Sequence, residues 1–190
     1  MLESLLTEIR QCTVCEPHLP LGANPVIRAH SEAKILIIGQ APGTKVHQTS
    51  IPWNDASGER LRQWLGLDRE AFYCEENIAI MPMGLCYPGK GRSGDLPPRK
   101  ECAPLWHAKV LEQLPNRQLT LLIGQYAQHY YLSDKPSTLT ETVQQWQRWA
   151  PSVLPLPHPS PRNTLWLRNH PWFEQDIVPY LRQRVKQVLT

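Results

Sequence analysis

The sequence contains no apolar run long enough to cross a membrane, and the stretch Ile35–Ile38 is typical of its hydrophobic segments. Its first four residues, Met-Leu-Glu-Ser, also lack the basic start and apolar stretch of a secretory signal, so we expect a cytoplasmic protein with no membrane contact. Hydrophobic residues make up 41% of the chain and charged residues only 19%, which excludes a disordered chain. The 190 residues suffice for one buried core, and we predict a single domain over residues 1–190.

A strong excess of charge of either sign is also missing, because the formal net charge is only +3. The positive residues are nevertheless gathered in two places. Residues 90–100 carry four cations and one acid, and residues 151–190 carry five cations and two acids. Separate basic stretches suit contact with a phosphate backbone, although an ordinary solvated surface explains the charge equally well.

Internal repeats and low-complexity linkers are absent, and apolar segments alternate with stretches of helical periodicity. The segments that read as buried strands are 34–39, 77–81, 119–124 and 153–157. The expected helices are 2–12, 58–66, 99–114, 125–132, 139–149 and 172–189. Strands that alternate with helices form a mainly parallel sheet with helices on both faces. We therefore predict an α/β fold, a three-layer α/β/α sandwich around a central, mainly parallel four-stranded sheet.

The residues that follow the predicted strands are the place to look for a ligand site, because open α/β sheets bind ligands beyond the carboxyl ends of their strands. The four segments are Gly-Gln-Ala-Pro-Gly at 39–43, Pro-Met-Gly at 82–84, Gly-Gln-Tyr at 124–126 and His-Pro-Ser-Pro-Arg-Asn at 158–163. Glycine lets a backbone approach a ligand closely, and free N–H groups hold anions. Tight strand-to-helix turns are the alternative explanation for each loop taken alone.

The two common nucleotide-binding signatures are missing. A P-loop needs Gly, four residues and then Gly-Lys-Ser/Thr, whereas residues 39–45 read Gly-Gln-Ala-Pro-Gly-Thr-Lys. No Gly-x-Gly-x-x-Gly is present either. The glycine-rich turn after the first strand is therefore not a nucleotide-binding loop of either kind.

Three segments in order resemble the signature motifs of the uracil-DNA glycosylase superfamily: 39–43, Ile-Pro-Trp-Asn-Asp-Ala-Ser-Gly at 51–58, and His-Pro-Ser-Pro at 158–161. The resemblance implies a monofunctional DNA glycosylase that hydrolyses the N-glycosidic bond of a deaminated base, with uracil expected, in base excision repair. The implied partner is DNA that contains a damaged or deaminated base. We expect the protein to be a monomer.

The cysteines add a second likeness. Two residues separate Cys12 from Cys15, and fifteen separate Cys86 from Cys102, which is similar to the iron–sulfur ligand pattern of the family-four enzymes. Four thiolates hold either zinc or a [4Fe–4S] cluster, and spacing alone does not separate the two. The resemblance favours the cluster on these four residues, with zinc and unligated thiols as alternatives and Cys74 as a bystander.

The chemistry of base excision explains why such residues are needed. Cleavage of the glycosidic bond leaves negative charge on the departing base, and His158 is the candidate to stabilise it through an N–H to the base carbonyl. The base must also be flipped out of the duplex and held. The resemblance assigns stacking to Trp53, and hydrogen bonds to Gln40 and to the backbone N–H groups from Ala41 to Gly43. The alternatives are core packing for the tryptophan and turn shaping for the loop.

The residue that activates water is not evident. The best-known family has an aspartate two residues after the first glycine of its first motif, where this chain has Ala41. Asp55, close to Trp53 in the sequence, is the nearest carboxylate and our substitute. Asn54 is the alternative, as a residue that positions the water.

Contacts to the flanking DNA are expected from Ser57 and Ser160, unless these serines only cap the helices that follow. Arg162 stands where the best-known family inserts an apolar wedge into the duplex, and it is expected to fill the gap or bind a phosphate. Lys90 and Arg92, in the first basic stretch, complete the expected DNA contacts.

The identity of the base stays open at this point. Many superfamily members read uracil with an asparagine at the end of the second strand, a place that Met-Pro-Met-Gly occupies here at 81–84. Hypoxanthine or another deaminated base is therefore an alternative to uracil. A non-catalytic nucleic-acid-binding module with the same fold and metal site is the alternative function, and a small-nucleotide hydrolase is a third.

Overall fold

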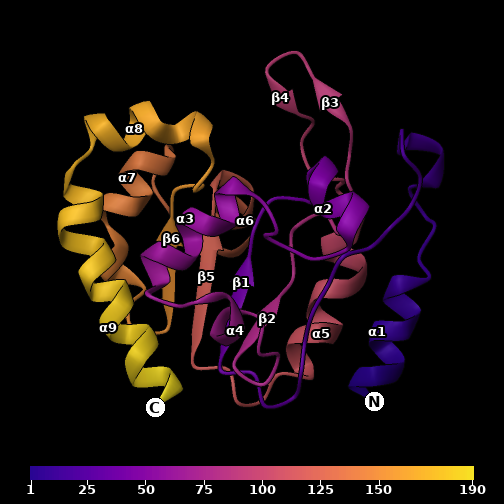
Figure 1. Ribbon diagram of the computed structural model, residues 1–190, viewed down its shortest axis with the longest axis horizontal. Coiled ribbons are helices and arrows are strands. Elements are labelled where there is room, and N and C mark those ends of the chain that lie inside the picture. The colour runs from indigo at the N-terminus through magenta and orange to yellow at the C-terminus, as the bar shows by residue number, and fades with distance from the viewer.

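The computed structural model describes all 190 residues and contains a central sheet of four parallel strands (Figure 1). The strands are β1 (Ile35–Ile38), β2 (Ile78–Ile80), β5 (Leu119–Ile123) and β6 (Val153–Leu156), in the order β2-β1-β5-β6. Each predicted strand is present within one or two residues of its expected ends. The edge position of β6 explains why it tolerates Pro155, since proline cannot donate to a further strand. The predicted fold class is confirmed.

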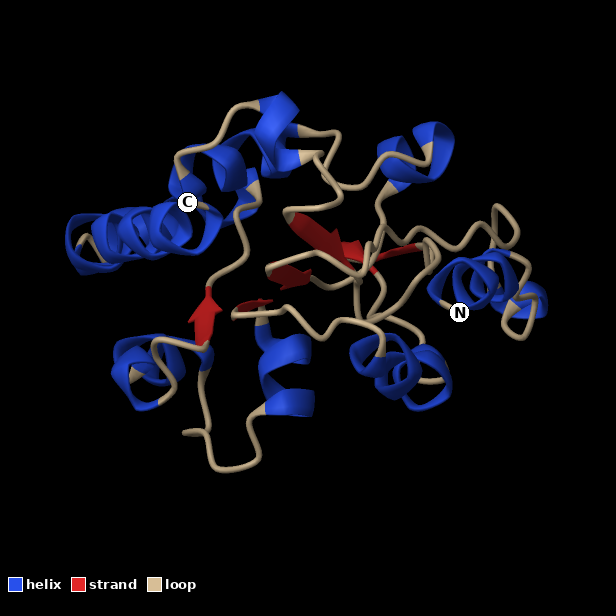
Figure 2. Ribbon diagram, turned by 90° about the horizontal axis from the view of Figure 1, so that it is seen from below, coloured by secondary structure: helices blue, strands red, loops and turns tan.

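Helices cover both faces of the sheet, and Figure 2 shows the strands between them. Alternate residues of a strand point to opposite faces, so Ile35 and Ile37 belong to one core while Leu36 and Ile38 belong to the other. The first core is closed by α3 (Ala56–Leu65), α4 (Arg69–Phe72), α7 (Leu139–Gln144), α8 (Thr164–Asn169), η5 (Phe173–Ile177) and α9 (Val178–Leu189). The second is closed by α1 (Leu2–Arg10), η2 (Ala103–His107), α5 (Ala108–Glu112) and α6 (Gln125–Tyr131). No helix is both long and apolar enough to pass through a bilayer.

Several helix boundaries differ from the expectation. The helix expected at 99–114 begins only at Cys102, and the one expected at 139–149 breaks into α7 and a 3₁₀ turn at Trp146–Arg148. The helix expected from residue 58 starts two residues earlier, because the Asp55 carboxylate caps it by accepting from the Gly58 N–H at 2.9 Å. The sequence prediction missed α2 (Thr44–Thr49), α4 and α8, which are too short for a periodic apolar pattern.

The basic segment 90–100, expected as a loop, contains a two-stranded hairpin. Strand β3 (Lys90–Gly91) pairs antiparallel with β4 (Gly94–Asp95), and Gly94 adopts a φ of +119°, which favours glycine. The hairpin projects beyond the carboxyl edge of the main sheet, at the top of Figure 1. It therefore brings charged residues to the edge where the sequence places the candidate site.

Candidate active site

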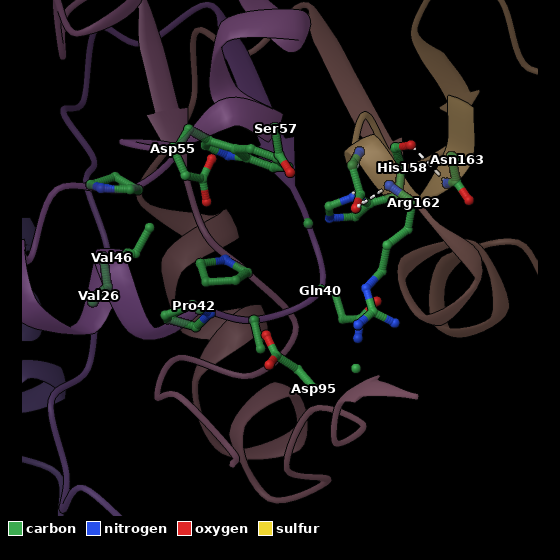
Figure 3. A pocket seen from close by; sticks show the side chains of 18 of the residues that line it. Val26, Gln40, Pro42, Val46, Asp55, Ser57, Asp95, His158, Arg162 and Asn163 are labelled. Carbon is green, nitrogen blue, oxygen red and sulfur yellow. Dashed lines mark hydrogen bonds between the residues drawn. The ribbon is translucent and has the colours of Figure 1, made fainter. Parts of the chain in front are cut away.

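A cavity of about 530 Å³ opens at the carboxyl edge of the sheet. Its walls come from the loop after β1, the segment before α3, the β3–β4 hairpin and the loop after β6 (Figure 3). The structure thus brings the three sequence motifs together around one space. Among the expected site residues, those that line it are Gln40, Ala41, Gly43, Trp53, Asp55, Ser57, Lys90, His158, Ser160 and Arg162.

His158 stands at the end of β6 with a defined tautomer. Its Nδ1 accepts a hydrogen bond from the backbone N–H of Ser160 at 3.1 Å. A neutral imidazole has one acceptor and one donor nitrogen, so the proton of His158 lies on Nε2. The Asn163 amide donates to the His158 carbonyl at 2.8 Å and fixes the loop from the other side. This side chain therefore presents an N–H donor through Nε2.

The charge of His158 follows from its surroundings. Burial lowers the pKa of His158 to about 4, although the nearby carboxylate of Asp55 acts in the opposite direction. Burial disfavours the charged form of a histidine, and the imidazole is neutral at pH 7. A neutral imidazole keeps one N–H, on Nε2, and can donate it to a group on which negative charge develops.

Trp53 lies beside His158, with ring centroids 5.6 Å apart and planes at 35°. Its backbone φ of 60° is unusual for a residue other than glycine. Two glycines make room for it: a Cβ on Gly39 would stand 2.9 Å from the indole, and one on Gly58 would collide with the Trp53 carbonyl. The buried Arg62 donates to that carbonyl at 3.0 Å. The indole is half-buried and packs partly on the core, so it is both a wall of the cavity and a core residue.

The loop after β1 is held against the loop after β2. The carbonyls of Gly39 and Gln40 accept from the backbone N–H groups of Met83 and Gly84, both at 2.9 Å. The Gln40 side chain makes no hydrogen bond of its own and lines the cavity, together with Ala41 and Gly43. The loop after β2 therefore fixes the glycine-rich loop, and the side of the glycine-rich loop that faces the cavity is free to bind a ligand.

The two candidates for the water-activating role have different places. Asp55 lines the cavity, but one of its carboxylate oxygens is engaged in the cap of α3. Asn54 does not line the cavity, because its amide accepts from Arg69 at 3.2 Å and donates to Thr49 at 3.4 Å.

The expected DNA-contacting residues gather at the cavity, with one exception. Ser57, Ser160 and Lys90 line the cavity, and Arg92 does not. Ser160 also accepts from the Arg162 backbone N–H at 3.1 Å, as a capping serine does. The Arg162 guanidinium donates to the Ser93 carbonyl at the tip of the hairpin, so this side chain bridges two walls of the cavity.

Two residues of this region were missed by the sequence prediction. Asp95, at the end of β4, lines the cavity beside Gly43, and only its place in a glycine-rich turn could have indicated it. His107 is buried behind the cavity, where its Nε2 donates to the Pro82 carbonyl at 3.0 Å and its Nδ1 accepts from the Tyr131 hydroxyl at 2.5 Å. No sequence pattern marked His107, because its partners lie 25 and 24 residues away.

Comparison with known proteins assigns the chain to a family. The model of the uracil DNA glycosylase superfamily matches residues 27–182, a stretch that contains all three motifs. The chain belongs to this superfamily. It is 22% identical over 162 residues to the Type-4 uracil-DNA glycosylase of Thermotoga maritima, a match that covers 84% of this chain and 82% of that relative. Membership of the superfamily supports a DNA glycosylase, a hydrolase that acts on DNA.

In this superfamily member, four of the five cysteines surround a second, small cavity. Its lining contains Cys12, Cys15, Cys86 and Cys102 among apolar residues, with the cation Arg99 at its wall. Cys74 lies elsewhere. The backbone N–H of Leu85 donates to the Cys102 sulfur at 3.5 Å. The predicted ligand set is therefore gathered by the fold from three separate parts of the chain.

These thiols sit in apolar surroundings. Burial raises the pKa of Cys86 to about 11 and also raises the pKa values of Cys15 and Cys102. No set of three or more Cys, His, Asp or Glu side chains converges on a point where it would hold a single metal ion. The four sulfurs instead line the walls of the cavity, and Arg99 supplies a positive charge beside them.

Proposed function

We propose that the protein hydrolyses the N-glycosidic bond of a deaminated base that is flipped out of DNA, with uracil as the first candidate. The observation that carries the proposal is the pair formed by His158 and Trp53. A neutral imidazole with its proton on Nε2 stands 5.6 Å from an indole at the wall of one cavity. Such a pair suits the capture of a flat heterocycle and the stabilisation of its negative charge as it departs.

Base capture follows from the shape of the cavity. The base cannot react inside a duplex, so it enters the cavity extrahelically and stacks on Trp53. The backbone N–H groups of Ala41 and Gly43 and the free amide of Gln40 belong to the same cavity wall and supply donors for base carbonyls. The hydrogen bonds that lock Gly39 and Gln40 to the β2 loop keep these donors in place before the substrate arrives.

Bond cleavage builds positive charge on the sugar and negative charge on the base. The Nε2–H of His158 donates to a base carbonyl on which that negative charge develops. The Ser160 N–H fixes the tautomer, because a proton on Nδ1 would point two donors at one another. His158 thus acts as an electrostatic donor in our proposal, not as a general base.

For the attacking water we propose Asp55. Its Oδ1 caps α3, and its other oxygen makes no hydrogen bond in the structure and belongs to the cavity wall. The cap orients the carboxylate and leaves one oxygen to hold a water molecule. Asn54, outside the cavity lining, has its amide engaged by Arg69 and Thr49 and is the weaker candidate.

DNA contacts are proposed for the rim of the cavity. Lys90, Ser57 and Ser160 line the cavity, and Arg92 lies in the turn of the hairpin between β3 and β4. Arg162 joins the hairpin to the loop after β6 through Ser93, so we propose that it contacts a phosphate beside the flipped nucleotide. Cations in this place add affinity that does not depend on sequence.

We further propose that the four gathered cysteines hold a [4Fe–4S] cluster. A zinc ion needs all four sulfurs about 2.3 Å from one point, whereas a cluster accepts sulfurs spread around its surface. The arrangement along the cavity walls, without convergence on a point, supports the cluster. The cavity holds only about 20 Å³, the size of about one water molecule, so the side chains around it would have to move apart for the four thiolates to hold a cluster.

The position of the cysteine cavity suits a structural role for the proposed cluster. Cys12 and Cys15 follow α1, Cys86 follows β2, and Cys102 opens η2. When bound, the cluster supplies covalent cross-links between these segments. Ligation by Cys86 and Cys102 would thereby hold the chain on both sides of the hairpin against the body of the protein.

Oligonucleotide cleavage tests the proposed function. Single- and double-stranded oligonucleotides with one uracil are incubated with protein and then treated with alkali, and wild type is compared with His158→Ala. We expect cleavage by the wild type and a single-turnover rate lower by about 10²–10³ in the variant, with little change in DNA affinity. Binding without cleavage by the wild type would instead identify a nucleic-acid-binding module. Wild-type rates in His158→Ala would remove the histidine from the mechanism.

A further inference from the structure

The wall that the end of β2 contributes to the base cavity has no free polar group. Pro82 has no side-chain donor or acceptor, and the buried His107 already occupies its carbonyl at 3.0 Å. Val26, Val46 and Ile80 extend this part of the lining as apolar surface. The polar edge of a base in the cavity must therefore be recognised by residues of another wall.

The β3–β4 hairpin supplies a carboxylate on that other side. Asp95 ends β4 and lines the cavity, and Figure 3 shows it across the cavity from Asp55. Its Oδ2 stands 3.6 Å from the place that a Cβ on Gly43 would take, an ordinary van der Waals distance, so the carboxylate lies beside the loop after β1. The Asp95 carboxylate makes no hydrogen bond and no ion pair.

Burial and two nearby cations act in opposite directions on the Asp95 carboxylate. Partial burial raises the pKa of Asp95, and the charges of Arg162 and Lys90 oppose that shift. Both cations act without direct contact with the carboxylate. Two acceptor oxygens therefore remain available to a ligand.

Deamination changes a base in a way that a carboxylate can detect. Cytosine has a bare ring nitrogen at position 3, and uracil has an N–H there. Adenine and hypoxanthine differ in the same way at position 1. A carboxylate accepts from the N–H of the deaminated base and repels the lone pair of the parent base.

We propose that Asp95 recognises the ring N–H that distinguishes a deaminated base from its parent, and that the β3–β4 hairpin is the specificity element of the cavity. The inference rests on the proposed function, because it requires a flipped base on Trp53. In this proposal the hairpin supplies, through Asp95, the polar group that the cavity wall at Pro82 lacks.

Steady-state kinetics on a single-stranded oligonucleotide with one uracil and no cytosine test the assignment. Asp95→Ala should lower kcat/KM by about 10- to 100-fold, mainly through KM, since a hydrogen bond to a charged group is lost. Asp95→Asn should lose less, because its amide still accepts. The Asn variant should also be inhibited several-fold more strongly by the same oligonucleotide with cytosine in place of uracil, since its NH₂ group donates to the bare nitrogen.

Asp176→Asn is the matched control, because it removes an exposed carboxylate that lies far from the cavity lining and has no partner. Unchanged kinetics in both Asp95 variants overturn the inference while the proposed function stands. An equal loss of kcat in both variants, with unchanged KM and unchanged cytosine inhibition, overturns it in favour of a role at the water molecule. A wild-type protein that cleaves no uracil overturns the proposed function and this inference with it.

Discussion

Single residues decide how this cavity presents its aromatic wall. Trp53 occupies a left-handed backbone conformation, which costs free energy for a bulky side chain, and its surroundings compensate. Arg62 binds its carbonyl, and the Tyr73 hydroxyl donates to the Pro52 carbonyl at 2.7 Å. Gly58 is required at its position because any side chain there would collide with the Trp53 carbonyl. The strain is thus stored at the place where a base is expected to stack.

Replacement of Trp53 tests the stacking role. Trp53→Ala should remove roughly 1–3 kcal/mol of base stacking and lower kcat/KM for a uracil oligonucleotide accordingly. Some loss of Tm is also expected, because the indole packs against the core. Activity and thermal unfolding are measured together. The control is Trp149→Ala, which removes another half-buried tryptophan, packed against the core on the other face of the sheet. A loss of Tm in both variants with normal turnover in both would make Trp53 a core residue only.

At the scale of elements, η2 connects the two cavities. It follows Cys102 at the cysteine cavity and ends at His107, whose Nε2 donates to the Pro82 carbonyl behind the base cavity. The Tyr131 hydroxyl of α6 completes the chain by donating to Nδ1, and the two rings stack at 15°. A π-helical turn changes the direction of side chains relative to an α-helix, and such turns are frequent at functional sites.

Removal of the Tyr131 hydroxyl tests this chain of contacts. Tyr131→Phe leaves the buried Nδ1 of His107 without a donor, which should cost about 1–3 kcal/mol of unfolding free energy. We also expect a higher KM for the uracil oligonucleotide, because Pro82 loses part of its support. Tyr130→Phe is the matched control, since this exposed neighbour makes no side-chain hydrogen bond. Equal urea midpoints in the two variants would show that the hydroxyl contributes nothing.

The cysteine cavity also belongs to the scale of elements, since it joins α1, the β2 loop and η2. Serine at Cys12, Cys15, Cys86 or Cys102 should lower the iron and sulfide content and the soluble yield of anaerobically purified protein. Cys74→Ser, outside the cavity, should leave both unchanged. Stoichiometric zinc without iron would replace the cluster by a zinc site. Equal metal content in all five variants would remove the site altogether.

The sequence alone predicted the sheet and the loops that follow its strands, because both depend on local patterns. Buried apolar runs end at Gly39, Gly124 and His158, and parallel strands place those ends together. The sequence did not predict Asp95 or the separation of Asn54 from Trp53. Asp95 reaches the cavity through a hairpin whose strands are only two residues long, and the Asn54 amide is held outside the cavity by Arg69 and Thr49. Both facts depend on backbone geometry and long-range contacts that a residue pattern does not record.

For the whole molecule, two histidines link stability to pH: His107, which is buried, and His158, at the wall of the base cavity. Burial lowers the pKa values of His107 and His158 to about 4, from an ordinary value of 6.5. The unfolded chain therefore binds more protons than the folded one between about pH 6.5 and pH 4. Stability from this source is fully present above about pH 6.5 and is lost as the pH falls toward 4. For the fully buried His107 alone, the loss amounts to about 3 kcal/mol.

His107→Gln should separate this effect from general acid denaturation. The variant should be less stable than wild type at pH 7, because the contacts to Pro82 and Tyr131 change, but its stability should fall less steeply between pH 6.5 and pH 4.5. Urea unfolding followed by circular dichroism at four pH values gives the two slopes. His18→Gln removes an exposed histidine and is the control. Parallel curves for wild type and His107→Gln would mean that the acid sensitivity arises elsewhere in the molecule, since a glutamine at this position takes up no proton.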